Sequence, residues 1–185
     1  MRKIYAFNLI TLDGFFEGPN RDISWHNVDD EFNEFAIEQL SAADLLMFGR
    51  VTYELMASYW PTEPALKNDP IVAGKMNSLP KIVFSRTLKA AAWNNTRLVK
   101  EHIPEEVASL KKQPGKDILV FGSANLLSTL VHEGLVDEFR IIINPILLGN
   151  GTPLFKDVQN KMNLKLLKTK TFRSGNVLLY YQPIK

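Results

Sequence analysis

The stretch from Asp117 to Gly134, DILVFGSANLLSTLVHEG, constrains the fold of this chain more than any other feature. Residues 118–121 form a continuous β-prone apolar run, which is typical of a strand buried on both faces. Gly122 then permits a tight turn, and Ser123 is a candidate N-cap for a following helix. The stretch therefore predicts a buried strand, a tight turn and a helix that ends at Gly134.

The predicted helix has its apolar side chains on one face, at Leu126, Leu127, Leu130 and Val131. Small residues at its start leave the first backbone N–H groups and the positive end of the helix dipole open to an anion. A lone glycine is a weaker signal than a full glycine-rich fingerprint. The stretch alone fits a phosphate site and a plain strand-helix connection equally well.

Two further strand ends carry groups that suit phosphate. Residues 44–48 read as a strand that ends in Gly49-Arg50, with Thr52 as a hydroxyl donor at the start of a second helix. The apolar strand 82–84 is followed by Ser85-Arg86-Thr87, and arginine can bind phosphate through two parallel hydrogen bonds. Ligands of open α/β sheets bind outside the carboxyl ends of the strands. We therefore expect the three strand ends to converge on a ligand with several phosphates.

The rest of the chain alternates strands and helices. We expect strands at 3–10, 96–100 and 136–143, helices from Asp29 and from Pro104, and a terminal hairpin of 164–172 with 177–182. Residues 61–80 contain four prolines and read as an irregular connection with one short helix near 71–76. This pattern predicts one α/β domain over residues 1–185, with a mainly parallel sheet and an antiparallel edge.

Composition excludes several classes of function. The net charge of +2 is spread without a long basic tract, which argues against nucleic acid and membrane surfaces as partners. The chain has no cysteine, and its three histidines are scattered, so we expect neither disulfides nor a metal centre. No apolar run approaches the roughly 20 residues of a membrane span. We expect a cytoplasmic protein.

Four segments together resemble the dihydrofolate reductase fold family, and especially the reductase domain of riboflavin biosynthesis, the RibD C-terminal domain. These are GRVTYE at 49–54, KIVFSRT at 81–87, VFGSANL at 120–126 and NPILLGNGTPLF at 144–155. The resemblance runs from the first strand, with Leu12-Asp13-Gly14, to the terminal hairpin. It implies a mainly parallel sheet of about eight strands with helices on both faces. The segment 145–155 resembles the riboflavin branch and implies a homodimer.

The resemblance also implies a reductase that uses NADPH. Ser85 and Arg86 match the pair expected at the adenosine 2′-phosphate, which would favour NADPH over NADH. The remaining matches are contacts to the other cofactor phosphates: Gly49, Arg50, Thr52, Gly122, Ser123, Ala124, Asn125 and Leu126.

The residues expected to bind substrate differ from those of both folate reductases and the riboflavin branch. Ser123 follows Gly122 where folate reductases have a second glycine, and Leu79 replaces the arginine that would hold the folate tail. Val120 stands where the riboflavin branch has a glutamate that contacts substrate, and the segment D-x-P-x-L-x-x-R is missing. The resemblance therefore leaves the substrate open.

Reduction of an imine needs a proton source near the acceptor nitrogen. Trp25 and Asp30 have the spacing at which folate reductases place a tryptophan and the substrate-binding carboxylate, so Asp30 is our catalytic candidate. The alternative is that Asp29, Asp30 and Glu31 only stabilise a helix N-terminus. We also place Asp13, Trp25 and Tyr53 in the substrate pocket that the resemblance implies.

Three hypotheses follow. The first is an NADPH-dependent reductase of a small heterocyclic or imine-type substrate. The second is a module that binds NADP(H) without catalysis, which the missing substrate residues favour. The third is a dimerising scaffold without a ligand, which rests on the apolar segment 145–155.

Overall fold

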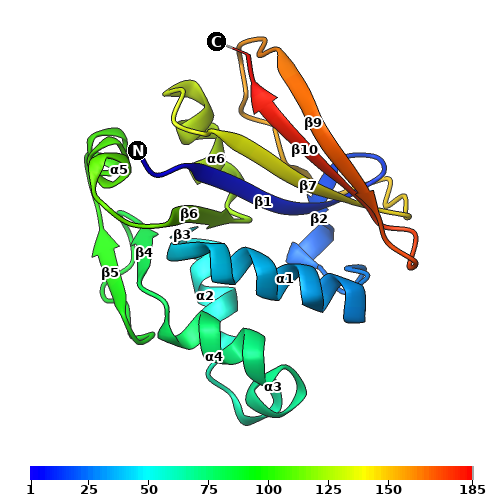
Figure 1. Ribbon diagram of the computed structural model, residues 1–185, viewed down its shortest axis with the longest axis horizontal. Helices are drawn as coiled ribbons and strands as arrows, with labels where there is room; N and C mark the ends of the chain where they lie inside the picture. The colour runs from blue at the N-terminus through cyan, green and yellow to red at the C-terminus, as the bar shows by residue number, and fades with distance from the viewer. Residues whose placement is uncertain (185) are drawn as a thin grey trace.

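A computed structural model describes residues 1–184 and confirms the α/β fold (Figure 1). An eight-stranded sheet has the order β5-β4-β3-β6-β1-β7-β10-β9. All neighbouring pairs are parallel except β7 with β10 and β10 with β9, which are antiparallel. The strands of this sheet are β1 (Ile4–Thr11), β3 (Ala43–Gly49), β4 (Lys81–Phe84), β5 (Thr96–Val99), β6 (Asp117–Phe121), β7 (Glu138–Asn144), β9 (Leu164–Thr171) and β10 (Val177–Pro183).

Helices cover both faces of the sheet (Figure 1). Side chains of α5 and α6 share one core cluster with Ile4 and Ala6 of β1. Side chains of α1, α2 and α4 pack on the opposite face, around Phe48 and Phe7. The helices are α1 (Asp30–Ala42), α2 (Arg50–Tyr59), α3 (Glu63–Asn68), α4 (Pro70–Ser78), α5 (Ile103–Lys112) and α6 (Ala124–His132), with a 3-10 turn, η1 (Pro19–Arg21).

The connection from β6 through α6 to β7 places α6 over β1. In the sheet, β1 stands between β6 and β7. Because α6 joins these two strands, it crosses the face of β1 on which Ile4 and Ala6 lie. The carboxyl end of β1 is therefore next to the start of α6.

A small second sheet and the helix α3 were not predicted from the sequence. The strands β2 (Phe15–Glu17) and β8 (Thr152–Pro153) form a small separate antiparallel sheet. The short helix predicted near residues 71–76 is confirmed as α4, but the rest of the segment 61–80 is less irregular than predicted, because it also forms α3. Two of its four prolines, Pro64 and Pro70, lie in the first turns of these helices, where the missing N–H costs nothing.

Lys81 joins α4 to the sheet through a buried ammonium group. Its Nζ donates to the carbonyl oxygens of Met76, Asn77 and Leu79 at 2.8, 3.1 and 2.7 Å, which satisfies the last turn of α4. The side chain is 1% exposed. Burial lowers the pKa of Lys81 from its usual 10.5 to about 8.

This shift predicts a pH dependence of stability. The folded pKa is below the unfolded one, so the folded state releases the proton first, and its free energy of unfolding rises with pH between these values. From about pH 8 to pH 10 we expect the wild type to gain about 2 kcal/mol relative to Lys81→Met in urea unfolding. Lys89→Met, at an exposed position, should leave the wild-type pH profile unchanged. A wild-type-to-Lys81→Met difference that stays constant with pH would contradict this prediction.

Candidate functional site

The entrances of α2 and α6 lie at adjacent strand ends. The strand β3 ends at Gly49, and α2 begins at Arg50. The strand β6 ends at Phe121, and both Gly122 and Ser123 are left-handed, with φ of 51° and 61°, before α6 begins. Two successive left-handed residues turn the chain sharply, so that α6 starts directly above the end of β6.

Ser123 is the N-cap residue of α6, as predicted, but its side chain does not cap the helix. Its Oγ makes no bond to the first turn of α6. Instead Oγ accepts from the backbone N–H of Gly49 at 2.8 Å and donates to the carbonyl of Phe121 at 2.9 Å. The left-handed backbone of Ser123 directs its side chain toward α2. The serine thereby ties the two helix entrances together.

Thr52 and two glycines complete this connection. The N–H of Ser123 donates to Thr52 Oγ1 at 3.0 Å, and Thr52 is buried. A Cβ placed on Gly122 would lie 2.9 Å from Thr52 Oγ1, and one on Gly49 would lie 3.4 Å from the side chain of Ser123. The close approach of the two junctions therefore leaves no room for a side chain at Gly122. Thr52, predicted as a phosphate donor, already holds this connection.

The third strand end stands beside the first two, because β4, β3 and β6 are neighbours in the sheet. Ser85 follows β4, and its Oγ accepts from the N–H groups of Thr87 and Leu88 at 3.2 and 2.9 Å. This turn places Arg86 at an exposed position. The three strand ends are therefore neighbours, as predicted, and the ligand between them stays a prediction.

The convergent groups suit an anion with several phosphates. The helices α2 and α6 start at the same edge of the sheet, so the positive ends of two dipoles lie together. The first-turn N–H groups of Ala124, Asn125 and Leu126 belong to this edge. Arg50 adds a charge that is paired with Glu54 at 3.0 Å, and Arg86 adds another. The donor set fits the phosphates of NADPH.

The three acidic residues at the start of α1 differ in their contacts. Asp29 is the N-cap, and its carboxylate accepts from the N–H of Phe32 at 2.8 Å, which confirms capping for this residue. Glu31 accepts from the N–H of Arg173 at 2.7 Å. Asp30 is the first residue of the helix and is exposed. Its catalytic role stays a prediction.

The three predicted substrate-pocket residues each hold a different part of the chain. The carboxylate of Asp13 accepts from Thr11 Oγ1 at 2.6 Å and from the N–H of Gly149 at 2.8 Å, and these bonds lower its pKa. Trp25 donates from its indole to the carbonyl of Asp22 at 3.0 Å. Tyr53 is buried, and its hydroxyl accepts from the N–H of Trp93 at 3.0 Å. Their contact with a substrate stays a prediction.

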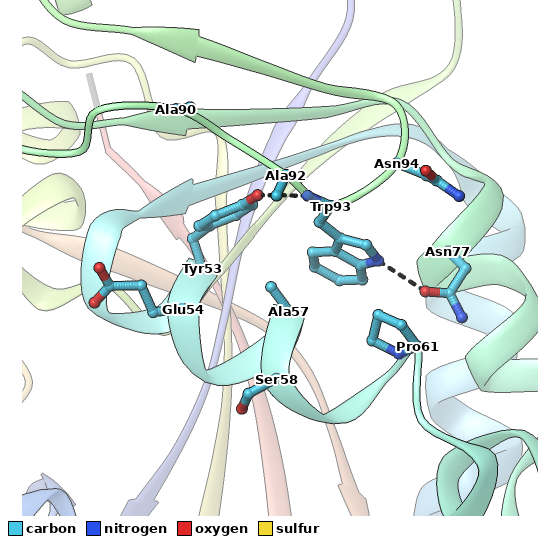
Figure 2. A pocket seen from close by; sticks show the side chains of 10 residues that line it. All are labelled: Tyr53, Glu54, Ala57, Ser58, Pro61, Asn77, Ala90, Ala92, Trp93 and Asn94. Carbon is cyan, nitrogen blue, oxygen red and sulfur yellow. Dashed lines mark hydrogen bonds between the residues drawn. The ribbon is translucent and has the colours of Figure 1, made fainter.

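Tyr53 also lines a cavity of about 640 Å³ on the side of α2 (Figure 2). Figure 2 shows the ring of Trp93 forming one wall, held by Tyr53 and by a 2.7 Å bond from its indole to Asn77 Oδ1. Small side chains such as Ala57 and Ala92 leave the space open. The lining includes Tyr53 and Glu54 of α2, but not Gly49, Arg50 or Thr52, and no residue of the turn before α6. The cavity is therefore a neighbour of the three strand ends and not part of them.

Sequence reasoning missed a group of asparagines that fixes the loop before α1. The N–H of Asn27 donates to Asn144 Oδ1 at 2.8 Å, and its side chain donates to the carbonyl of Ser174 at 2.9 Å. Its carbonyl accepts from Asn176 Nδ2 at 2.7 Å. Asn144 and Asn176 are fully buried. These bonds join the loop to the end of β7 and to the terminal hairpin.

His26 lies next to this group and is largely buried. Its ring packs edge-on against Trp25, with 4.5 Å between centroids. Burial lowers its pKa to about 4, although the nearby Asp22 acts in the opposite direction. His26 is therefore neutral at neutral pH. Within residues 1–184, no group of three or more histidine, aspartate or glutamate side chains could hold a metal ion.

Sequence reasoning also missed Asn8, a buried polar residue of β1. The only signal in the sequence is one amide inside the apolar run IYAFNLIT. None of the helices in the described part of the chain is long and apolar enough to cross a membrane.

Comparison with known proteins agrees with this architecture. The uncharacterized Bacillus subtilis protein YyaP is 40% identical over 182 residues, covering 97% of this chain and 94% of YyaP. A putative riboflavin biosynthesis protein from Shewanella sp. PV-4 has a similar structure, with a TM-score of 0.75, 23% identity and 99% of each chain covered.

A second similar structure is a Thermotoga maritima diaminohydroxyphosphoribosylaminopyrimidine deaminase/5-amino-6-(5-phosphoribosylamino)uracil reductase. Its TM-score is 0.71 at 14% identity, with 99% of this chain and 57% of the Thermotoga chain covered. At these identities the two structures establish the fold alone, which is dihydrofolate reductase-like. The family model of the RibD C-terminal domain matches residues 2–178. The chain therefore belongs to the RibD C-terminal domain family.

Proposed function

We propose that this chain is an NADPH-dependent reductase of a small heterocyclic or imine-type substrate. The observation that carries this proposal is the connection between the starts of α2 and α6 through Ser123 and Thr52, with Arg86 at the neighbouring strand end. Membership of the RibD C-terminal domain family supports it, as does the reductase activity for which the Thermotoga protein is named.

The residues of the strand ends would hold the cofactor. The first-turn N–H groups of α2 and α6 bind the pyrophosphate, since helix N-termini favour anions. Ser85 and Arg86 bind the 2′-phosphate, and this contact selects NADPH over NADH. Gly49 and Gly122 let the two backbones approach closely enough to surround one ligand.

The chemistry is hydride transfer, and NADPH supplies the hydride when it is bound. The carbon of the acceptor C=N bond takes the hydride, and its nitrogen takes one proton, so an imine becomes an amine. In this proposal Asp30 holds the acceptor nitrogen and delivers the proton from the start of α1.

A panel of imine, pterin and pyrimidine acceptors tests this reaction. The loss of reduced nicotinamide absorbance with any of them, dependent on the protein, would support a reductase. The second candidate is a module that binds NADP(H) without catalysis, which the substrate residues replaced by Leu79 and Val120 favour. Tight NADPH binding without turnover across the panel would establish that alternative.

Arg86→Gln tests the cofactor preference. Because the amide cannot form charge-assisted bonds to a phosphate, we expect NADPH affinity to fall about 30-fold while NADH affinity is unchanged. Isothermal titration measures both. Arg97→Gln is the matched control, because Arg97 is also exposed but pairs with Glu106 of α5. Equal weakening of NADPH and NADH by Arg86→Gln would contradict the assignment.

We also infer that the protein is a homodimer and acts in the cytoplasm. The segment 145–155 exposes 68% of Leu147 and 42% of Phe155, and a second copy could cover them. Sedimentation of the purified chain would test the dimer, and a monomer at micromolar concentration would contradict it.

A further inference from the structure

The cavity on the side of α2 is lined neither by the proposed cofactor residues nor by Asp30. It lies between α2 and the connection 85–95, which leads from β4 to β5 (Figure 2). Asp30 begins α1, and the loop before α1 is joined to the end of β7 and to the terminal hairpin. In the sheet, β7 and the hairpin stand on the other side of β3 from β4 and β5. A molecule in the cavity is therefore a second ligand and not the substrate that is reduced.

The size and the walls of the cavity suit a small planar molecule. Its volume of about 640 Å³ is in the range of small-molecule sites. The flat indole of Trp93 forms one wall, and hydrogen bonds to Tyr53 and Asn77 hold this residue at its backbone and at its ring. Three alanines, among them Ala57, leave the space in front of the wall open. Because the wall is already fixed, a flat ring that stacks on it needs little reorganisation of the protein.

The charges around the cavity favour a neutral ligand. Among the described residues that line it, Glu54 is the only charged one, and its carboxylate repels an anion. This carboxylate is paired with Arg50 at 3.0 Å, so it offers little to a cation. Lys81 is outside the lining, but its Nζ lies 4.6 Å from the centroid of the Trp93 ring and repels a second cation there. Neither sign of charge is therefore favoured in a ligand.

Two hydrogen-bond donors remain at the ends of the Trp93 wall, as Figure 2 shows. The hydroxyl of Tyr53 accepts from the N–H of Trp93, so its own hydrogen can be donated to a ligand. The Nδ2 group of Asn77 has two hydrogens and donates one of them to the carbonyl of Trp60 at 2.9 Å. Both donors suit an acceptor such as a carbonyl oxygen at the edge of a ring.

We propose that this cavity binds a small neutral aromatic carbonyl compound. The ring stacks on the indole of Trp93 beside Ala57, and the carbonyl oxygen accepts from the Tyr53 hydroxyl or from the Asn77 amide. Binding displaces water from an apolar wall that cannot hydrogen-bond it, which favours association. The site needs no NADPH, so this inference does not rest on the proposed function.

Acetophenone is the probe, because it is a neutral aromatic ring with one carbonyl oxygen. Its titration is followed by nuclear magnetic resonance through the indole N–H signal of Trp93, which a stacked ring shifts. We expect a saturable shift with a dissociation constant of about 1 mM. Benzoate has a similar frame with a negative charge and should bind at least about 10-fold more weakly. Ethylbenzene lacks the carbonyl and should bind at least about 3-fold more weakly.

A substitution that fills the cavity tests its location. Ala57→Leu adds a larger side chain to the lining and should abolish the shift by acetophenone. Ala108→Leu is the matched control, because Ala108 is also a half-buried helical alanine but belongs to α5, outside the lining. Its affinity for acetophenone should equal that of the wild type. If Ala57→Leu does not fold, Ala92→Leu replaces it, since Ala92 is an exposed residue of the lining.

The outcomes separate cleanly. A saturable shift in the wild type and in Ala108→Leu that is lost in the cavity-filling variant supports the proposal. It is overturned by the absence of a saturable shift, by equal affinity for benzoate or ethylbenzene, or by full binding to a folded cavity-filling variant. Displacement of acetophenone by NADPH would also overturn it, because the probe would then occupy the cofactor site.

Discussion

Gly122→Ala should weaken NADPH binding by at least about 100-fold, whereas Gly134→Ala should leave that binding unchanged. Both glycines flank α6, and both are left-handed, with φ of 51° and 62°. They differ in their surroundings. A Cβ on Gly122 would lie 2.9 Å from Thr52 Oγ1, but nothing lies within 4 Å of a Cβ on Gly134.

The methyl group added by Gly122→Ala therefore disturbs the connection between α2 and α6, in addition to straining the left-handed backbone. To relieve the contact, Thr52 must move away from Gly122, which breaks the bond from the N–H of Ser123 and separates the starts of α2 and α6. The N–H groups of the two helices can then no longer reach one pyrophosphate. The strain common to both variants is about 1 kcal/mol, and Gly122→Ala should cost about 2 kcal/mol more.

Urea unfolding and NADPH titration of the two variants give the comparison. The expected pattern is a moderate stability loss for Gly134→Ala with full binding, and a larger loss for Gly122→Ala with almost none. Full NADPH binding by a folded Gly122→Ala variant would contradict the role of this junction in holding the cofactor.

Asp30→Asn should lower the turnover of NADPH about 100-fold or more and leave NADPH affinity unchanged. Asp30 is exposed at the first position of α1, so an asparagine there keeps the shape and the fold. The amide cannot deliver a proton or carry the charge that holds a protonated nitrogen. The cofactor residues belong to other elements and are not altered.

Asp29→Asn is the matched control for this variant. Asp29 is the N-cap that accepts from the N–H of Phe32, and asparagine is an equally good cap. Its turnover and stability should therefore stay close to the wild-type values. Turnover by Asp30→Asn at the wild-type rate would remove Asp30 from the mechanism.

Local sequence was enough to predict the strand ends at which we place the cofactor. The buried strands 118–121 and 44–48 are recognisable in the sequence as apolar runs. Each is followed by a glycine and then by a helix. Since parallel strands end at one edge, their convergence followed without any knowledge of distant contacts. The detail at Ser123 could not be predicted, because it depends on Gly49, 74 positions away in the chain.

The errors have physical causes as well. The prolines Pro64 and Pro70 were interpreted as helix breakers, although proline suits the first turn of a helix. The bonds of Asn27 join residues 117 to 149 positions apart, so no local pattern reveals them. Asn8 could have been found from its amide in an apolar strand, but its lack of partners is visible only in three dimensions.

Isothermal titration of the unmodified chain with NADPH and NADH tests the central claim most directly. If the ends of β4, β3 and β6 form a dinucleotide site, NADPH binds saturably, and NADH binds at least about 10-fold more weakly for want of the 2′-phosphate. No binding of NADPH at millimolar concentration would contradict the account.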